Sequence, residues 1–303
     1  MKVPAPALAI SAMVSVQLGA ALSTHLFAAL TPSGSAWLRV AIAAVILLAA
    51  TRPKLRGLSR SAVRGALLLG TATGVMTLVF IEAVARIPLG TTVAIEFLGP
   101  LTVAAMRTHR RSALVWPALA LVGVVGLTRP WTGHLNLLGI AFAAAAALGW
   151  AGYILLTQRV GTQLQGLQGL ALSLGTAAVV TAPFAGWPAI HGLTPVIALQ
   201  ALGLALLVPL LPFAFEMLAL RRMTVAAFGT LMALEPGIGT AFGLVLLAQT
   251  PSPLQVLGVV LVIVAGIGAQ RTPPLAGVEP ARNTMREPIT TVRPKGKSCH
   301  TTG

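Results

Sequence analysis

The feature that most constrains this chain is the alternation of long apolar runs with short basic segments. Ten runs can be drawn, each long enough at 1.5 Å per residue to cross or nearly cross a hydrocarbon core about 30 Å thick. Their approximate limits are 7–29, 35–51, 62–84, 88–106, 112–128, 135–157, 166–186, 195–220, 224–247 and 253–270. With 56% hydrophobic and 9% charged residues over 303 positions, the chain is too apolar for a soluble domain. We expect an all-α polytopic membrane protein in a lipid bilayer.

The basic residues indicate how these spans are oriented. With the N-terminus inside, 18 of the 21 Lys and Arg residues fall on the cytoplasmic side, two fall outside, and Arg39 lies within the second span. Such a bias follows the positive-inside rule, and it predicts cytoplasmic N- and C-termini around an even number of spans. The net charge of +15 therefore reflects topology, and we expect no nucleic-acid partner.

The two halves of the chain resemble one another. Residues 112–127 are similar to 252–267, and Glu96 precedes Glu235 by a closely matching offset. Five spans per repeat force the second copy to enter the membrane from the opposite side, as in many secondary transporters. We expect two inverted five-helix repeats at 1–130 and 131–271, although chance similarity between apolar helices is the alternative. Residues 272–303 are too polar to pack a core, and they predict a disordered cytoplasmic tail.

The sequence gives no indication of a cofactor, a metal ion or enzymatic chemistry. The single cysteine, Cys299, cannot form an internal disulfide, and no Cys/His spacing is typical of a metal site. A phosphate-binding loop, an HExxH motif and a GxSxG motif are all missing. Any transport should therefore draw on an ion gradient rather than on nucleotide hydrolysis.

Carboxyl groups inside the spans are the strongest functional signal. The chain has six acidic residues, all Glu, and two of them lie near the middle of long apolar runs. Glu96 is followed by Gly99-Pro100, and Glu235 is followed directly by Pro236-Gly237. Proline interrupts a membrane helix and frees backbone carbonyls, whereas desolvation favours the neutral form of a carboxyl and suits it to carry protons. We expect a shared substrate and proton site, and the alternative is a hydrogen bond that only ties helices together.

Three further charged residues are candidates for the same site. Glu82 lies near the outer end of its span, and Glu216 lies near the inner end of its own, where it has Arg221 and Arg222 as possible partners. Both Glu side chains can also reach interfacial water. Arg39, about one turn inside the second span, is expected either to reach outward or to bind a substrate carboxylate.

With these residues in place, the chain resembles the EamA branch of the drug/metabolite transporter superfamily, most closely its threonine/homoserine exporters. The similarity is carried by Ala94-Ile-Glu96-Phe-x-Gly99-Pro, by Glu216-Met-x-Ala-Leu and by Phe228-Gly-Thr-Leu-Met-x-Leu-Glu235-Pro, and it covers about residues 7–270. One departure is Ala248-Gln249, where the family often has Gly-Glu, so an acid at that point has no counterpart here.

The resemblance implies ten helices in two inverted EamA repeats, a central substrate cavity, an inner-membrane location and efflux of small metabolites. We expect proton-coupled export of a small-molecule substrate, an amino acid such as threonine or homoserine, by alternating access. A drug, sugar or nucleoside carrier of the same family is one alternative, and a receptor or scaffold that binds without transporting is another. The sequence leaves the oligomeric state open.

Overall fold

The computed structural model describes residues 3–53, 59–107, 111–129, 131, 136–160, 166–220, 222–223 and 225–271, and the regular structure within these ranges is helical. The predicted tail at 272–303 lies outside them. The helices are α1 (Ala5–Ser23), η1 (Thr24–Leu26), α2 (Phe27–Leu30), α3 (Pro32–Thr51), α4 (Arg60–Val84), α5 (Leu89–Glu96), α6 (Leu98–Arg107), η2 (Arg111–Leu114), α7 (Val115–Thr128), α8 (Leu137–Val160), α9 (Gly166–His191), α10 (Pro195–Ala205), η4 (Leu206–Leu210), α11 (Leu211–Leu220), α12 (Val225–Met232), α13 (Glu235–Leu247) and α14 (Pro253–Arg271).

The helices agree with the expectation of a multi-pass membrane protein. In the described part of the chain, nine helical runs are long and apolar enough to cross a bilayer, and the span expected at 112–128 is a shorter apolar helix, Ser112–Thr128. The turn predicted at residues 86–88 is present, because α4 ends at Val84 and α5 begins at Leu89. The ten-helix count and the repeat layout remain predictions.

Two spans are interrupted next to a glutamate. Within the expected span 88–106, α5 ends at Glu96 and α6 begins at Leu98. Within 224–247, α12 ends at Met232 and α13 begins at Glu235, after a two-residue turn. Each break lies close to the proline that the sequence supplies, since a proline lacks the N–H of a regular helical turn.

A third interruption divides the expected span 195–220. Its helical path passes through η4, where Val208 is extended (φ −149°, ψ 112°) and precedes a cis peptide bond to Pro209. Such a break leaves backbone carbonyls without helical partners, and these must be satisfied inside the protein. Ser15 of α1 meets part of this need, because its Oγ donates a hydrogen bond to the Leu207 carbonyl at 2.8 Å.

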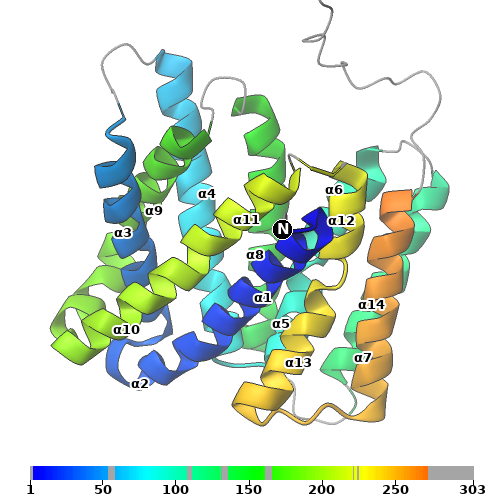
Figure 1. The fold of residues 1–303 in the computed structure, drawn as a ribbon. Helices are drawn as coiled ribbons and strands as arrows, with labels where there is room; N and C mark the ends of the chain where they lie inside the picture. The colour runs from blue at the N-terminus through cyan, green and yellow to red at the C-terminus, as the bar shows by residue number, and fades with distance from the viewer. Residues whose placement is uncertain are drawn as a thin grey trace, which may run out of the picture.

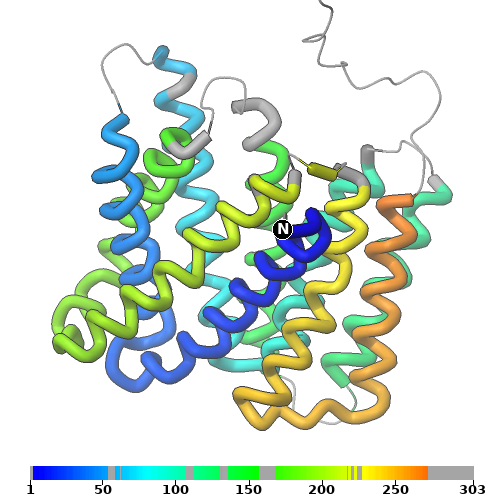
Figure 2. The backbone as a smooth tube through the Cα atoms, viewed as in Figure 1, coloured from blue at the N-terminus to red at the C-terminus, as the bar shows by residue number. Residues whose placement is uncertain are grey.

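The helices form one bundle in which the two halves of the chain interlock (Figure 1). α3 and α4 pack against α9 on one side, α7 packs against α14 on the other, and α5 packs against α13 between them. α1 lies along η4 and α11, and these segments cross the bundle obliquely in the tube view (Figure 2). Each of these contacts joins a helix of the first half to one of the second.

The close approach of α4 to α9 depends on two glycines of α4 that lie four residues apart. A Cβ at Gly70 would lie 2.5 Å from the Ser173 carbonyl oxygen, and one at Gly74 would lie 3.1 Å from the backbone of Ala177. These two glycines therefore bring α4 directly against α9. In a membrane, where lipid is as apolar as the helix surface, such packing replaces the hydrophobic effect as a source of association.

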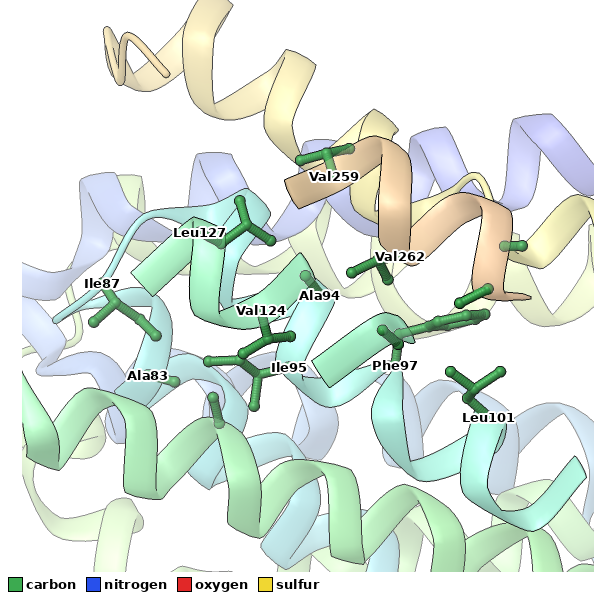
Figure 3. Close-up of a cluster of buried hydrophobic side chains, with 14 of the residues drawn as sticks. Ala83, Ile87, Ala94, Ile95, Phe97, Leu101, Val124, Leu127, Val259 and Val262 are labelled. Carbon is green, nitrogen blue, oxygen red and sulfur yellow. The ribbon is translucent and has the colours of Figure 1, made fainter. Parts of the chain in front are cut away.

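A buried apolar cluster holds the broken helix α5–α6 in place. It joins Ile95 and Phe97 to side chains of α7 and α14, among them Val124, Leu127 and Val262 (Figure 3). Ile95 and Phe97 flank Glu96 in the chain, and their exposed fractions are 3% and 4%. The backbone at Glu96 is therefore fixed by its buried neighbours on both sides.

Candidate functional site

The two mid-span glutamates lie at facing helix ends in the interior of the bundle. Glu96 is the last residue of α5, Glu235 is the first residue of α13, and α5 packs against α13. Their exposed fractions are 9% and 5%. The two carboxyls are close enough to interact electrostatically. Two such groups repel each other when both are ionised, so they favour states in which a proton or a bound cation lies between them.

Local backbone structure gives Glu235 a specific environment. It occupies the first turn of α13, with Pro236 directly after it, where backbone N–H groups lack helical acceptors. The positive end of a helix dipole interacts favourably with negative charge. Glu235 can therefore hold a negative charge at this position better than it could in the middle of a helix.

Glu216 reaches the same region from a third helix. It lies on α11, is partly buried, and interacts electrostatically with Glu235. Arg222, one of its two possible partners, donates instead to the Val3 carbonyl at 3.0 Å. The other possible partner, Arg221, lies outside the described residues. The structure thus gathers Glu96, Glu216 and Glu235 from three helices.

Sequence reasoning missed one polar member of this cluster, Gln17 of α1. Its exposed fraction is 1%, and its Nε2 donates a hydrogen bond to Glu235 Oε1 at 3.4 Å. Two buried oxygens of this pair, Gln17 Oε1 and Glu235 Oε2, have no hydrogen-bond partner among the described residues. An uncharged amide inside an apolar span was the only available signal, and the fold was needed to connect it with Glu235.

Glu82 is placed apart from this cluster, at the end of α4. Its Oε1 accepts a hydrogen bond from the Ser33 backbone N–H at 3.1 Å, and its Oε2 forms an ion pair with Arg86. Arg86 in turn lies over the ring of Phe142, 5.0 Å from its centroid. Glu82 therefore joins the ends of α3 and α4, and its role as a site residue remains a prediction.

Arg39 is buried, with an exposed fraction of 3%, and does not reach outward. Its Nη1 donates a hydrogen bond to Ser23 Oγ at 3.1 Å, and its Nε has no partner in the part of the chain that the structure describes. A guanidinium without a carboxylate partner is an available anion-binding group. The second alternative from the sequence, a role toward a substrate carboxylate, therefore stays open.

A cavity of about 190 Å³ lies at one end of the α5–α13 contact. It is lined by Pro88, Gly90, Thr91, Leu127, Thr240, Gln249, Thr250, Pro251 and Gln255. Gln249 crosses between the two halves, because its Oε1 accepts a hydrogen bond from the Leu89 backbone N–H at 3.0 Å. The amide found in place of an acid at this position thus caps the start of α5.

Among the described residues, no group of three or more His, Cys, Asp or Glu side chains could hold a metal ion. The chemistry present is that of carboxyl and amide groups within a multi-pass helical bundle. Fold and site together define the class of helical membrane carriers, in which such groups bind a solute or a proton.

Comparisons with known proteins agree with this class. The EamA-like transporter family matches residues 137–268. The threonine/homoserine exporter RhtA of Escherichia coli (strain K12) is 35% identical over 86% of this chain and 89% of its own, and that of Salmonella typhimurium (strain LT2) is 33% identical with the same coverage. A solved crystal structure, 20% identical, superposes with a TM-score of 0.56 over 88% of this chain and 97% of its own, which shows the shared fold.

The chain belongs to the EamA-like transporter family. The predicted family is thereby confirmed, as is the prediction that the chain is a membrane exporter rather than an enzyme.

Proposed function

We propose that this protein is a secondary-active exporter of small neutral amino acids, with threonine and homoserine as the leading substrates. The observation that carries the proposal is the meeting of Glu96 and Glu235, one from each half of the chain, at two broken helices that pack together. The substrate class is supported by relatives at 33–35% identity that are named threonine/homoserine exporters.

The proposed mechanism is exchange of substrate for protons by alternating access. A pair of buried carboxyls needs neutralisation, which either a proton or a substrate ammonium group can supply. If the two compete, a proton that enters from outside releases the substrate there, and loss of that proton inside restores the site. The halves would rock around this point and expose it to each side in turn.

The helix contacts support an inverted repeat with units at 1–130 and 131–271. An inverted repeat pairs each span of the first half with the span five places later in the chain. When the paired spans are exchanged, the contact between α1 and α11 becomes the contact between α8 and α4, and both contacts are present. The same exchange turns the contact between α1 and α13 into the contact between α8 and α5, which is also present. Three further contacts join paired spans and are therefore unchanged by the exchange: α3–α9, α5–α13 and α7–α14. This pattern is expected of two copies related by a pseudo-two-fold axis in the membrane plane.

Under this proposal the protein lies in the inner membrane with both termini in the cytoplasm. The 18-to-2 bias of basic residues supports that orientation. Glu216 and Arg39 are proposed as further substrate contacts, because Glu216 joins the carboxyl cluster and Arg39 is an uncompensated buried cation.

Counterflow of labelled threonine in proteoliposomes tests this proposal. A carrier preloaded with threonine should accumulate the label transiently, whereas a receptor or scaffold should not. In cells, overexpression should lower intracellular threonine and raise resistance to homoserine. Counterflow of a sugar, nucleoside or drug without any threonine signal would favour the alternative substrates of this family.

A further inference from the structure

The clearest unexplained feature of the site is a pair of buried oxygen atoms without donors. Gln17 Oε1 and Glu235 Oε2 belong to two side chains that are already hydrogen-bonded to each other, and neither atom has a partner among the residues described. A buried acceptor without a donor is energetically unfavourable, because it has given up its hydrogen bonds to water. Two of them in one contact indicate a place where a donor is bound during function.

Gln17 Oε1 lies beside a glycine of α13. Glu235 and Gly239 are four residues apart and share one face of α13. A Cβ built on Gly239 would lie 3.2 Å from Gln17 Oε1 and 3.1 Å from Val93 of α5. Since glycine has no Cβ, the amide oxygen faces bare backbone there, and a larger residue would crowd it.

The chemistry of the two oxygens selects the ligand. Both are acceptors, and one belongs to a carboxyl group, so an anion would be repelled and a group without N–H or O–H would leave them unsatisfied. A primary ammonium carries three donors, no acceptor and a positive charge. It can donate to an amide oxygen and to a carboxyl oxygen alike, and its bond to a carboxylate is a strong, charge-assisted one.

We propose that Gln17 and Glu235 form a subsite for the primary ammonium group of the substrate, in which Gln17 Oε1 determines specificity. This inference rests on the proposed function and names the part of the substrate that the carboxyl cluster takes. Glu96 lies on α5, which packs against α13, and Glu216 lies on α11, which packs against α1, so both further carboxyls belong to helices that contact the helices of the Gln17–Glu235 pair.

Arg39, which lies on α3, is too far from Gln17 to complete this subsite in the present conformation. It is bonded to Ser23, which is six residues beyond Gln17 and therefore about 9 Å further along the helix axis. The ammonium and carboxylate of an α-amino acid are attached to the same carbon. Gln17 and Glu235 are therefore the two residues assigned to the ammonium group.

The test compares three ligands on purified protein in nanodiscs. Threonine carries both charged groups, 1-aminopropan-2-ol lacks the carboxylate, and 2,3-dihydroxybutanoate has a hydroxyl in place of the ammonium. Gln17→Met removes the amide at nearly constant volume. This variant should bind threonine and the amino alcohol about tenfold to a hundredfold more weakly, which is the loss expected for one hydrogen bond to a charged group. Its affinity for the hydroxy acid should not change.

Gln200 supplies the matched control, because it is exposed on α10 and the same change there should alter no affinity. Gly239→Ala is a second variant that keeps both polar side chains and crowds the oxygen. It too should weaken the two ammonium ligands selectively. The subsite would be overturned if a folded Gln17→Met protein bound threonine as tightly as the wild-type protein does. It would also be overturned if the wild-type protein bound threonine and the hydroxy acid with equal affinity.

The outcomes separate this inference from the proposed function. If the wild-type protein shows threonine counterflow and the Gln17→Met variant binds threonine normally, the proposed exporter function stands and the proposed subsite is wrong. If binding of the amino alcohol depends on Gln17 but threonine counterflow is absent, the proposed subsite stands and the proposed substrate is wrong. Failure of the wild-type protein to bind either ammonium compound would overturn both.

Discussion

Glu82 and Glu235 illustrate how differently two carboxyls of this chain are held. Glu82 accepts hydrogen bonds from the Ser33 backbone and from Arg86, so both of its oxygens are satisfied. Glu235 has one weak bond from Gln17 and one oxygen without a described donor. A satisfied pair stabilises one conformation, whereas an unsatisfied one is available to a ligand or a proton. We therefore propose a structural role for Glu82, in place of the site role predicted from the sequence, and keep Glu235 in the site.

Replacement of Glu82 by Ala should therefore reduce stability and spare transport. The Ser33 N–H would lose its acceptor and Arg86 would lose its carboxylate partner, at a cost of about 1–3 kcal/mol. Thermal unfolding in detergent should show a lower melting temperature, while threonine counterflow per folded molecule should stay near wild type. Abolished counterflow at unchanged stability would instead place Glu82 in the substrate site, as its position inside a span first indicated.

At the scale of helices, α5 and α13 determine where the site lies. They approach so closely that a Cβ at Gly90 would lie 2.0 Å from Thr240 Oγ1 and 2.8 Å from its Cα. Gln249, which follows α13 in the chain, joins the two helices near this contact by accepting a hydrogen bond from the Leu89 backbone N–H at the start of α5. The two broken helices are thus clamped at one end, and they carry Glu96 and Glu235 at their interruptions.

Gly90→Ala should separate α5 from α13, because the added methyl group meets the backbone of the facing helix. Overpacking of this kind costs about 1–3 kcal/mol, so the melting temperature should fall and counterflow should decline. Gly152 and Gly203 provide controls, since no atom lies within 4 Å of a Cβ at either position. Alanine there should be neutral or slightly stabilising, given its higher helix propensity. A Gly90→Ala protein as stable as these controls would contradict the clamp.

Sequence and structure agree well at this scale and less well at the scale of contacts. Spans and breaks could be predicted because apolar length and proline act locally, as at Pro100 and Pro236. The bonds of Gln17 to Glu235 and of Gln249 to Leu89 could not, because each joins residues more than 150 positions apart. Glu82 looked like Glu216 in sequence, and only the partners supplied by the fold distinguished them.

At the scale of the whole molecule, the two halves form one interlocked bundle. Helices of the first half contact those of the second across the bundle, from α3–α9 on one side to α7–α14 on the other. Movement of one half against the other would therefore change many contacts together, and under the proposed mechanism it would open the site between them to one side at a time.

The predicted topology can be tested with reporter fusions or with cysteine labelling. Ser59 should report a cytoplasmic location and Gly192 an external one, because the basic residues are biased toward one side of the membrane. Cys299, the single native cysteine, can be replaced first to give a clean background. An external Ser59 or a cytoplasmic Gly192 would remove the inverted-repeat argument.

The central claim is that Glu96 and Glu235 couple substrate to protons, and pH-gradient-driven threonine uptake into inverted vesicles tests it most directly. Gln keeps the shape and hydrogen-bonding capacity of Glu but cannot titrate. Glu96→Gln and Glu235→Gln should therefore fold like the wild-type protein and lose gradient-driven uptake, while the control Gln200→Met retains it. Wild-type coupling in both Gln variants, together with reduced stability of the corresponding Ala variants, would show that these carboxyls only tie helices together.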